Sequence, residues 1–141
     1  MDDRRGNGTT RLRRRATRLG LALRVVSGWA TVSALVRIHP LPKLADRLSR
    51  PRRRRRRRLA PGILSRAVDR RLRIGRYRPR CLIGALVLYR LLRAQGDPAV
   101  LVIGLSEAGD GPDAHAWVEL GGADAGPPPG RAGHVAMARF P

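Results

Sequence analysis

The chain has little of several residue types, and each scarcity excludes something. Its 141 residues include a single cysteine, Cys81, so an internal disulfide framework and a cysteine-based zinc cluster are both excluded. Two Trp, two Tyr and one Phe are too few for an aromatic platform that binds single-stranded nucleic acid by stacking. Lysine is almost missing as well, since Lys43 is the one lysine among 30 basic residues. Hydrophobic residues at 43% still allow one modest core, in a chain long enough for one ordinary domain.

The basic charge is large and unevenly distributed. The formal net charge is +20, with 28 basic and four acidic side chains in residues 1–93 but two basic and six acidic ones in residues 94–141. Such a charge favours nucleic acid or an anionic membrane surface as a partner. GC-rich codon usage, however, would produce the same excess of arginine over lysine. We therefore expect no nucleic-acid partner, and a basic nucleic-acid-binding protein is kept as an alternative.

No segment has the pattern of a secretory signal or a clear membrane span. The best candidate for a span, Gly20 to Val36, is near the lower limit of spanning length and contains Arg24 in its interior. A helix that packs on the protein or on a partner explains this segment better. With a lone thiol and no export signal, we expect the chain to be cytoplasmic.

The first 62 residues predict a basic helical region. Residues 1–10 carry glycines and no periodicity, which predicts a disordered start. In residues 11–62, apolar residues first recur near helical spacing as far as Ile38, with arginines on much of the other side, and Pro40 ends this pattern. We expect one or two amphipathic helices here, then a short segment from Lys43 to Leu48. The expected apolar face comprises Leu12, Ala16, Leu19, Leu23, Val26 and Ala30.

Seven consecutive arginines, Arg52 to Arg58, follow this region. A block of like charge repels itself and usually stays solvated, so the run predicts a flexible linker. A docking strip for an acidic partner is the alternative.

Residues 63–141 predict helices followed by an antiparallel sheet, which is an α+β plan. A short helix with Ile63, Ala67 and Leu72 on one side precedes a helix from Cys81 to Ala94 that is apolar nearly all round and so belongs at the centre of the domain. Three strands should complete a small sheet, with a hairpin turn directly after the second. The strands are expected at Ala99–Leu105, His115–Leu120 and Gly133–Phe140, with the turn at Gly121-Gly122.

Cys81 and His115 are the candidate catalytic residues. Cys81 lies in the first turn of the central helix, where unpaired N–H groups, with Arg78 and Arg80 beside it, favour the thiolate and can bind an oxyanion. An inert buried cysteine is the competing interpretation. His115 begins a strand 34 residues downstream, and a cysteine on a central helix with a histidine on an adjacent strand is the papain-like arrangement of nucleophile and base.

The other two histidines are weaker candidates for a base. His39 lies in a proline turn, and His134 lies near the chain end without an acidic or thiol neighbour in the sequence.

The segment R-C-L-I-G-A-L-V-L-Y-R-L-L-R-A-Q-G-D-P-A-V-L-V-I-G-L, followed by A-H-A-W-V-E-L-G-G, resembles the leader peptidases of lasso-peptide biosynthesis. These are transglutaminase-like cysteine proteases, and the similarity covers about 60 residues, Ser65 to Gly122, in a chain whose length suits the stand-alone form without a leader-recognition domain. The resemblance implies a transglutaminase/papain-like core in residues 63–141, with Cys81 as nucleophile and His115 as general base. Trp117 and Glu119 belong to the same motif strand.

The third catalytic residue is where this chain departs from the family pattern. The family carries an Asp twelve residues after the histidine, where this chain has Pro127. The nearest acid is Asp124, which a strict two-residue turn places opposite Glu119, roughly 13 Å along the strand from His115. Asp124 is therefore a weak candidate, and a carbonyl or a water could orient the imidazole instead.

The resemblance implies a cysteine peptidase that removes the leader from a ribosomally made precursor before macrolactam cyclisation. The implied partners are the precursor peptide, a separate leader-recognition protein and an ATP-dependent cyclase, with no metal or organic cofactor. A catalytically impaired scaffold for the cyclase complex is the alternative that Pro127 favours. Amide cross-linking by a transglutaminase-type reaction would also need an amine acceptor site, which the sequence does not show.

Overall fold

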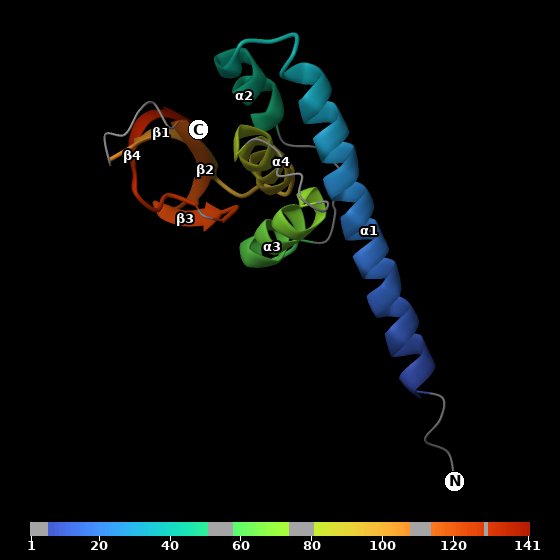
Figure 1. Cartoon of the computed structure of the whole chain (residues 1–141). Helices are drawn as coiled ribbons and strands as arrows, with labels where there is room; N and C mark the ends of the chain where they lie inside the picture. Colours follow the sequence, from blue (N-terminus) through green and yellow to red (C-terminus); the bar gives the residue numbers. More distant parts are fainter. Residues whose placement is uncertain (1–5, 51–57, 74–80, 108–113, 129) are drawn as a thin grey trace.

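The computed structural model describes residues 6–50, 58–73, 81–107, 114–128 and 130–141, with side chains of the first helix described from residue 16 onward. Four helices precede four strands along the chain (Figure 1). The helices are α1 Gly6–Leu35, α2 Leu41–Ser49, α3 Pro61–Leu72 and α4 Cys81–Ala94. The strands are β1 Ala99–Ser106, β2 Ala114–Leu120, β3 Ala123–Gly126 and β4 His134–Phe140. The predicted α+β class is confirmed.

The first helix buries a different face from the one that the sequence predicts. Val25 and Val32 are fully buried, whereas Leu19 and Leu23 are 64% and 63% exposed. The apolar face that we expected in the core therefore points to solvent, and the opposite face, with Val25 and Val32, packs into the core that α4 shares. The helix also begins at Gly6, so residues 6–10 are helical where a disordered start was predicted. Its N-terminal half extends beyond the other elements (Figure 1).

The short helices α2 and α3 both begin with a proline near the N-terminus, where its missing N–H costs no hydrogen bond. In α3 the buried side chains are Leu64, Ser65, Val68 and Leu72. Of the three residues predicted to share the apolar side, Leu72 is buried and Ala67 packs against the core, whereas Ile63 is 42% exposed.

The helix α4 is the centre of the domain, as its apolar sequence predicts. Its bounds, Cys81–Ala94, are those expected, and it contacts α1, α2, α3, β1 and β2. Leu86, Leu88 and Leu92 are fully buried among the other helices and the sheet. The chain reverses after it at Gly96, whose φ of 90° favours glycine.

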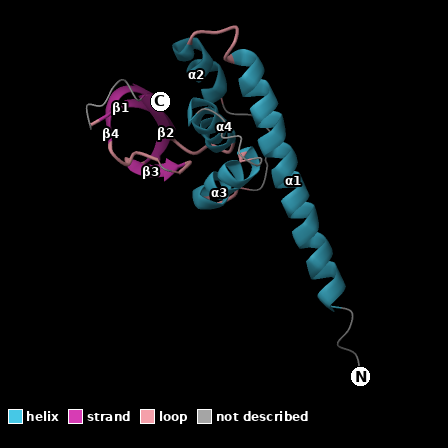
Figure 2. Ribbon diagram, in the orientation of Figure 1, coloured by secondary structure: helices cyan, strands magenta, loops and turns pink. Residues whose placement is uncertain are grey.

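The four strands form one antiparallel sheet in the order β3-β2-β1-β4, which curls beside the helices (Figure 2). Ala116 and Val118 of β2 belong to the core shared with α4. The alternate residues of β2 therefore lie on the other face, where Trp117 is also fully buried. The predicted hairpin is confirmed: Gly121 and Gly122 both have positive φ, and β3 pairs with β2 directly after them.

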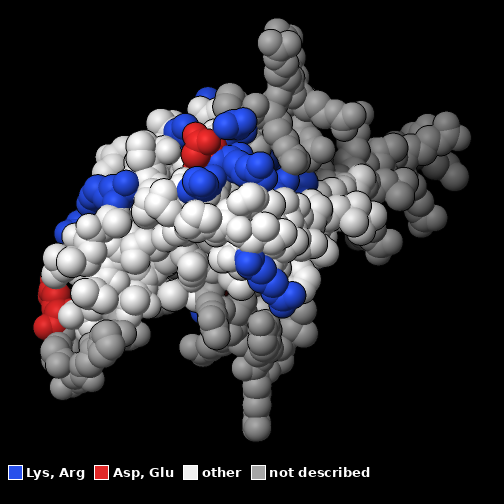
Figure 3. All heavy atoms as spheres, turned by 90° about the horizontal axis from the view of Figure 1, so that it is seen from above, with Lys and Arg blue, Asp and Glu red and all other residues white. Residues whose placement is uncertain are grey.

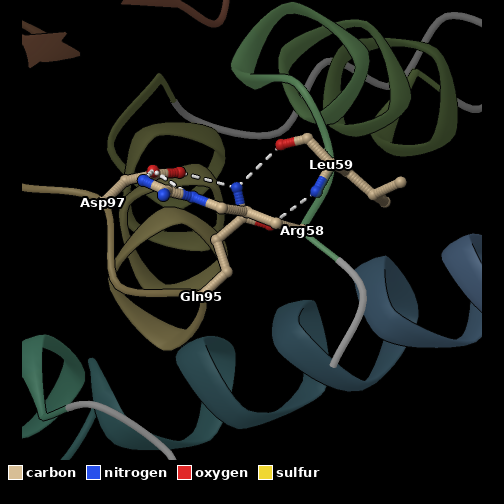
Figure 4. A network of polar contacts seen from close by, with 4 residues as sticks. All are labelled: Arg58, Leu59, Gln95 and Asp97. Carbon is tan, nitrogen blue, oxygen red and sulfur yellow. Dashed lines mark hydrogen bonds and ion pairs between the residues drawn. The ribbon is translucent and has the colours of Figure 1, made fainter. Parts of the chain in front are cut away.

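A polar network fixes the end of the arginine run to the turn after α4. The Arg58 guanidinium forms an ion pair with Asp97, which is only 5% exposed, and Gln95 donates to both the Leu59 carbonyl, at 2.8 Å, and Asp97 (Figure 4). The Leu59 N–H donates back to Gln95 Oε1 at 3.2 Å. The last arginine of the run is thus a structural anchor, while residues 52–57 lie outside the described residues.

Basic side chains are widespread and acidic ones few on the face shown in Figure 3.

Within the described ranges, none of the helices combines the length and apolar character that a membrane crossing requires.

Candidate active site

Cys81 lies at the N-terminus of α4, where the helix meets one end of β2. Its side chain is partly buried, and its Sγ is 3.7 Å from the carbonyl oxygen of Ala114, the first residue of that strand and the neighbour of His115. The thiol therefore lies at the end of the strand that carries the candidate base. Arg78 and Arg80, which the sequence places beside the thiol, lie outside the described residues.

A small pocket adjoins the thiol. It encloses about 180 Å³, and its wall includes Cys81 and Gly84 of α4, His115 and Ala116 of β2, and Pro127 after β3. Pro128 and the α3 residues Val68, Asp69, Leu72 and Arg73 complete the lining. Asp69 and Arg73 are paired with each other, 2.7 Å apart. The sheet, α3 and α4 thus bring both candidate catalytic residues to one mostly apolar pocket, which we call the thiol pocket.

His115 belongs to a cluster of three rings that spans β1. Its imidazole is stacked on Trp117, with centroids 6.3 Å apart, and its centroid is 4.8 Å from that of His134 on β4. Gly104 of β1 lies between β2 and β4, and a Cβ there would stand 2.7 Å from the Trp117 ring. The glycine therefore leaves the space in which the three rings meet.

His134, which the sequence analysis set aside as a weaker candidate, lies beside His115 in the structure. Its Nδ1 is 2.7 Å from the Ala132 carbonyl, which can only accept, so Nδ1 carries the proton. The bulge between Ile103 and Gly104 changes the pairing of β4 and brings His134 to the face of the sheet that carries His115. No local sequence feature could have located this residue at the site.

Glu119 lies on the same face of the sheet as His115 and Trp117, near the other end of β2. The carboxylate is almost fully buried, forms an ion pair with Arg139 and accepts a hydrogen bond from Trp117 Nε1 at 3.1 Å. Burial raises the pKa of Glu119, but the hydrogen bonds from Arg139 and Trp117 outweigh it and hold the pKa below its ordinary value. Glu119 thus fixes the indole on which His115 is stacked.

Asp124 lies opposite Glu119, as the two-residue turn predicts, and not beside His115. Its carboxylate accepts hydrogen bonds from the backbone N–H groups of Gly126 and Arg131, both at 2.7 Å. These bonds close the loop that carries Pro127 and Pro128 into the wall of the thiol pocket. Asp124 therefore shapes the pocket from a distance, and the structure does not group it with Cys81 and His115.

In the described part of the chain, no cluster of three His, Cys, Asp or Glu side chains could hold a metal ion.

The sequence model of one protein family, the transglutaminase-like superfamily, matches residues 22–136. This range is most of the chain and contains all the residues that line the thiol pocket. The chain belongs to this superfamily. Comparison with curated proteins and with solved structures gave no match. The match begins within α1 and ends within β4, so the four-helix and four-strand arrangement described above corresponds to a transglutaminase-like core.

Proposed function

We propose that the protein is a cysteine peptidase of the transglutaminase-like superfamily in which Cys81 is the nucleophile and His115 the general base. The observation that carries the proposal is the shared pocket: a thiol at a helix N-terminus lies at the end of the strand that carries the histidine, and both residues line the same pocket. Membership in a superfamily that includes many cysteine peptidases supports the same activity.

The proposed reaction is amide hydrolysis through a thioester on Cys81. His115 takes the proton of the Cys81 thiol, the sulfur attacks the carbonyl carbon of the scissile amide, and the N–H groups at the α4 N-terminus stabilise the oxyanion. The C–N bond then breaks as His115 protonates the leaving amine. Water, deprotonated by the same imidazole, hydrolyses the thioester and releases the acid.

We propose further that the substrate is the leader–core precursor of a lasso peptide, and that the enzyme works with a separate leader-recognition protein and an ATP-dependent cyclase. This finer proposal is supported by the similarity of the Cys81 and His115 segments to the leader peptidases. The expected location is the cytoplasm, where the precursor is made.

A scaffold without catalysis is the second candidate, and one observation favours it. Pro127 stands where the family pattern has an Asp. The Asp124 carboxylate accepts hydrogen bonds from the backbone N–H groups of Gly126 and Arg131 instead of contacting His115. In that case the protein would hold the cyclase complex together without cleaving the precursor.

Cleavage of the precursor by the purified protein, with its leader-recognition partner and followed by mass spectrometry, separates these candidates. We expect Cys81→Ala and His115→Ala each to lower the rate by at least about 10³-fold, because nucleophile and base act as a unit. Asp124→Ala should cost far less, since it alters the loop and not the imidazole. An active Cys81→Ala protein would exclude the peptidase, and an inactive unmodified protein would favour the scaffold.

A second assay, alkylation of Cys81 by iodoacetamide, needs no knowledge of the substrate. Cys81 is the only thiol in the chain, so the mass increase reports on this residue alone. We expect His115→Ala to slow alkylation near neutral pH, whereas His39→Ala, in the turn between α1 and α2, should leave the rate unchanged. Equal rates in both variants would remove His115 from the role of base.

A further inference from the structure

A groove between α1 and α3 is lined by four arginines that have no acidic partner. Arg18 of α1 and Arg66, Arg70 and Arg71 of α3 border a hollow of about 400 Å³. All four side chains are exposed, and none of them forms an ion pair or a hydrogen bond with another residue that the structure describes. We call this hollow the arginine groove.

The acidic residue of α3 does not neutralise these charges. Asp69 lies on the other side of the helix, where it is paired with Arg73 and lines the thiol pocket. Four like charges held together without a counter-charge raise the local positive potential and attract an anionic ligand.

The floor of the arginine groove is aliphatic. Leu21 of α1 and Ile63 and Ala67 of α3 line it, and Ile63 is 42% exposed although it is large and apolar. The lining contains no aromatic ring on which a nucleobase could stack. Guanidinium groups above an aliphatic floor instead fit a peptide with carboxylate side chains next to an apolar one, because the planar guanidinium binds carboxylates in a bidentate manner.

The arginine groove and the thiol pocket lie on opposite sides of the same helix. Residues 63, 66, 67, 70 and 71 of α3 face the groove, whereas residues 68, 69, 72 and 73 line the pocket. A helix with its side chains is about 10 Å across. A path around half of a helix 10–12 Å in diameter is roughly 16–19 Å long, which an extended peptide rising about 3.3 Å per residue covers in about five or six residues.

We propose that the arginine groove binds an acidic segment of the peptide substrate and holds it about five or six residues from the bond at Cys81. The link to Cys81 rests on the peptidase function proposed above, whereas the binding of an acidic peptide does not.

The binding test uses the full chain with Cys81→Ser, so that no cleavage can occur. A fluorescent 12-residue peptide with three glutamates and one leucine is titrated by anisotropy, against the same peptide with the glutamates replaced by glutamines. We expect the acidic peptide to bind more tightly, with an affinity that falls as salt rises. Arg66→Gln with Arg70→Gln should weaken its binding roughly tenfold.

The matched control is Arg37→Gln with Lys43→Gln, which removes the same charge from exposed positions outside the groove. It should change the affinity by less than about twofold. Circular dichroism and the urea midpoint check that both double variants fold as the parent does.

Three results would overturn the proposal. The first is equal binding of the glutamate and glutamine peptides, and the second is an equal loss in the groove variant and its control. The third is a single-stranded DNA oligonucleotide that binds more tightly than the acidic peptide and depends on Arg66 and Arg70, because the ligand would then be nucleic acid.

The position of the groove relative to Cys81 is tested with the unmodified thiol. A chloroacetyl group placed six residues from the glutamates should alkylate Cys81 faster than it does on the glutamine peptide, and Arg66→Gln with Arg70→Gln should remove the difference. A protein that binds the acidic peptide but cleaves no precursor would refute the peptidase function and leave the groove in place. A protein that cleaves the precursor equally well with and without Arg66 and Arg70 would refute the role of the groove and leave the peptidase function in place.

Discussion

Replacing Gly104 with alanine tests whether the three-ring cluster packs as described. A Cβ at this position would lie 2.5 Å from the Val135 carbonyl oxygen and 2.7 Å from two carbons of Trp117, where ordinary contacts are 3.4–4 Å. The carbonyl belongs to the backbone of a paired strand and the indole is fully buried, so neither can move freely. Overpacking of this kind costs about 3 kcal/mol.

The assay is urea unfolding followed by tryptophan fluorescence, with a thermal scan in parallel. For a chain of this length we expect Gly104→Ala to lower the midpoint by roughly 6–12 °C. The matched control is Gly28→Ala in α1, where the new Cβ would meet Val87 at an ordinary 3.4 Å. The free energy of unfolding of that variant should rise by about 0.5–1 kcal/mol, because alanine is more favourable than glycine inside a helix. A Gly104→Ala protein as stable as the parent would refute the packing of Trp117 across β1.

Three further predictions concern the faces of α1, the buried carboxylate and the second histidine. Val25→Ala should cost about 2 kcal/mol in urea unfolding and Leu23→Ala less than about 0.5, the reverse of what the sequence pattern implies. Because the pKa of Glu119 is lowered in the folded state, its ionised form stabilises the protein above the ordinary value of 4.5 and this stabilisation is lost as pH falls below it. Glu119→Gln should therefore be less stable than the parent at pH 7, with a gap that narrows in acid; a gap that is constant with pH contradicts the ion pair with Arg139. His134→Ala should slow alkylation of the pocket thiol roughly tenfold and His134→Phe by less than about twofold, since the ring contact positions the base; equal losses would instead require the His134 nitrogen atoms.

The sequence by itself determined the parts of the fold that depend on local pattern. The bounds of α4 follow from an unbroken apolar helix that only the centre of a domain can accommodate. The hairpin register follows from two consecutive glycines that adopt positive φ, and this register alone separates Asp124 from His115. The transglutaminase-like core could be named from the cysteine and histidine segments because such motifs are contiguous in the chain.

Only the tertiary structure decided what depends on contacts between distant segments. Both faces of α1 are apolar enough to be buried, and the choice between them was made by the fit of Val25 and Val32 against α4, which periodicity cannot measure. Likewise, the pairing of β4 with β1 and one bulge in it bring His134 to His115. The alternation of side chains along a strand predicts a face only until an extra residue reverses it, and that residue is selected by the partner strand.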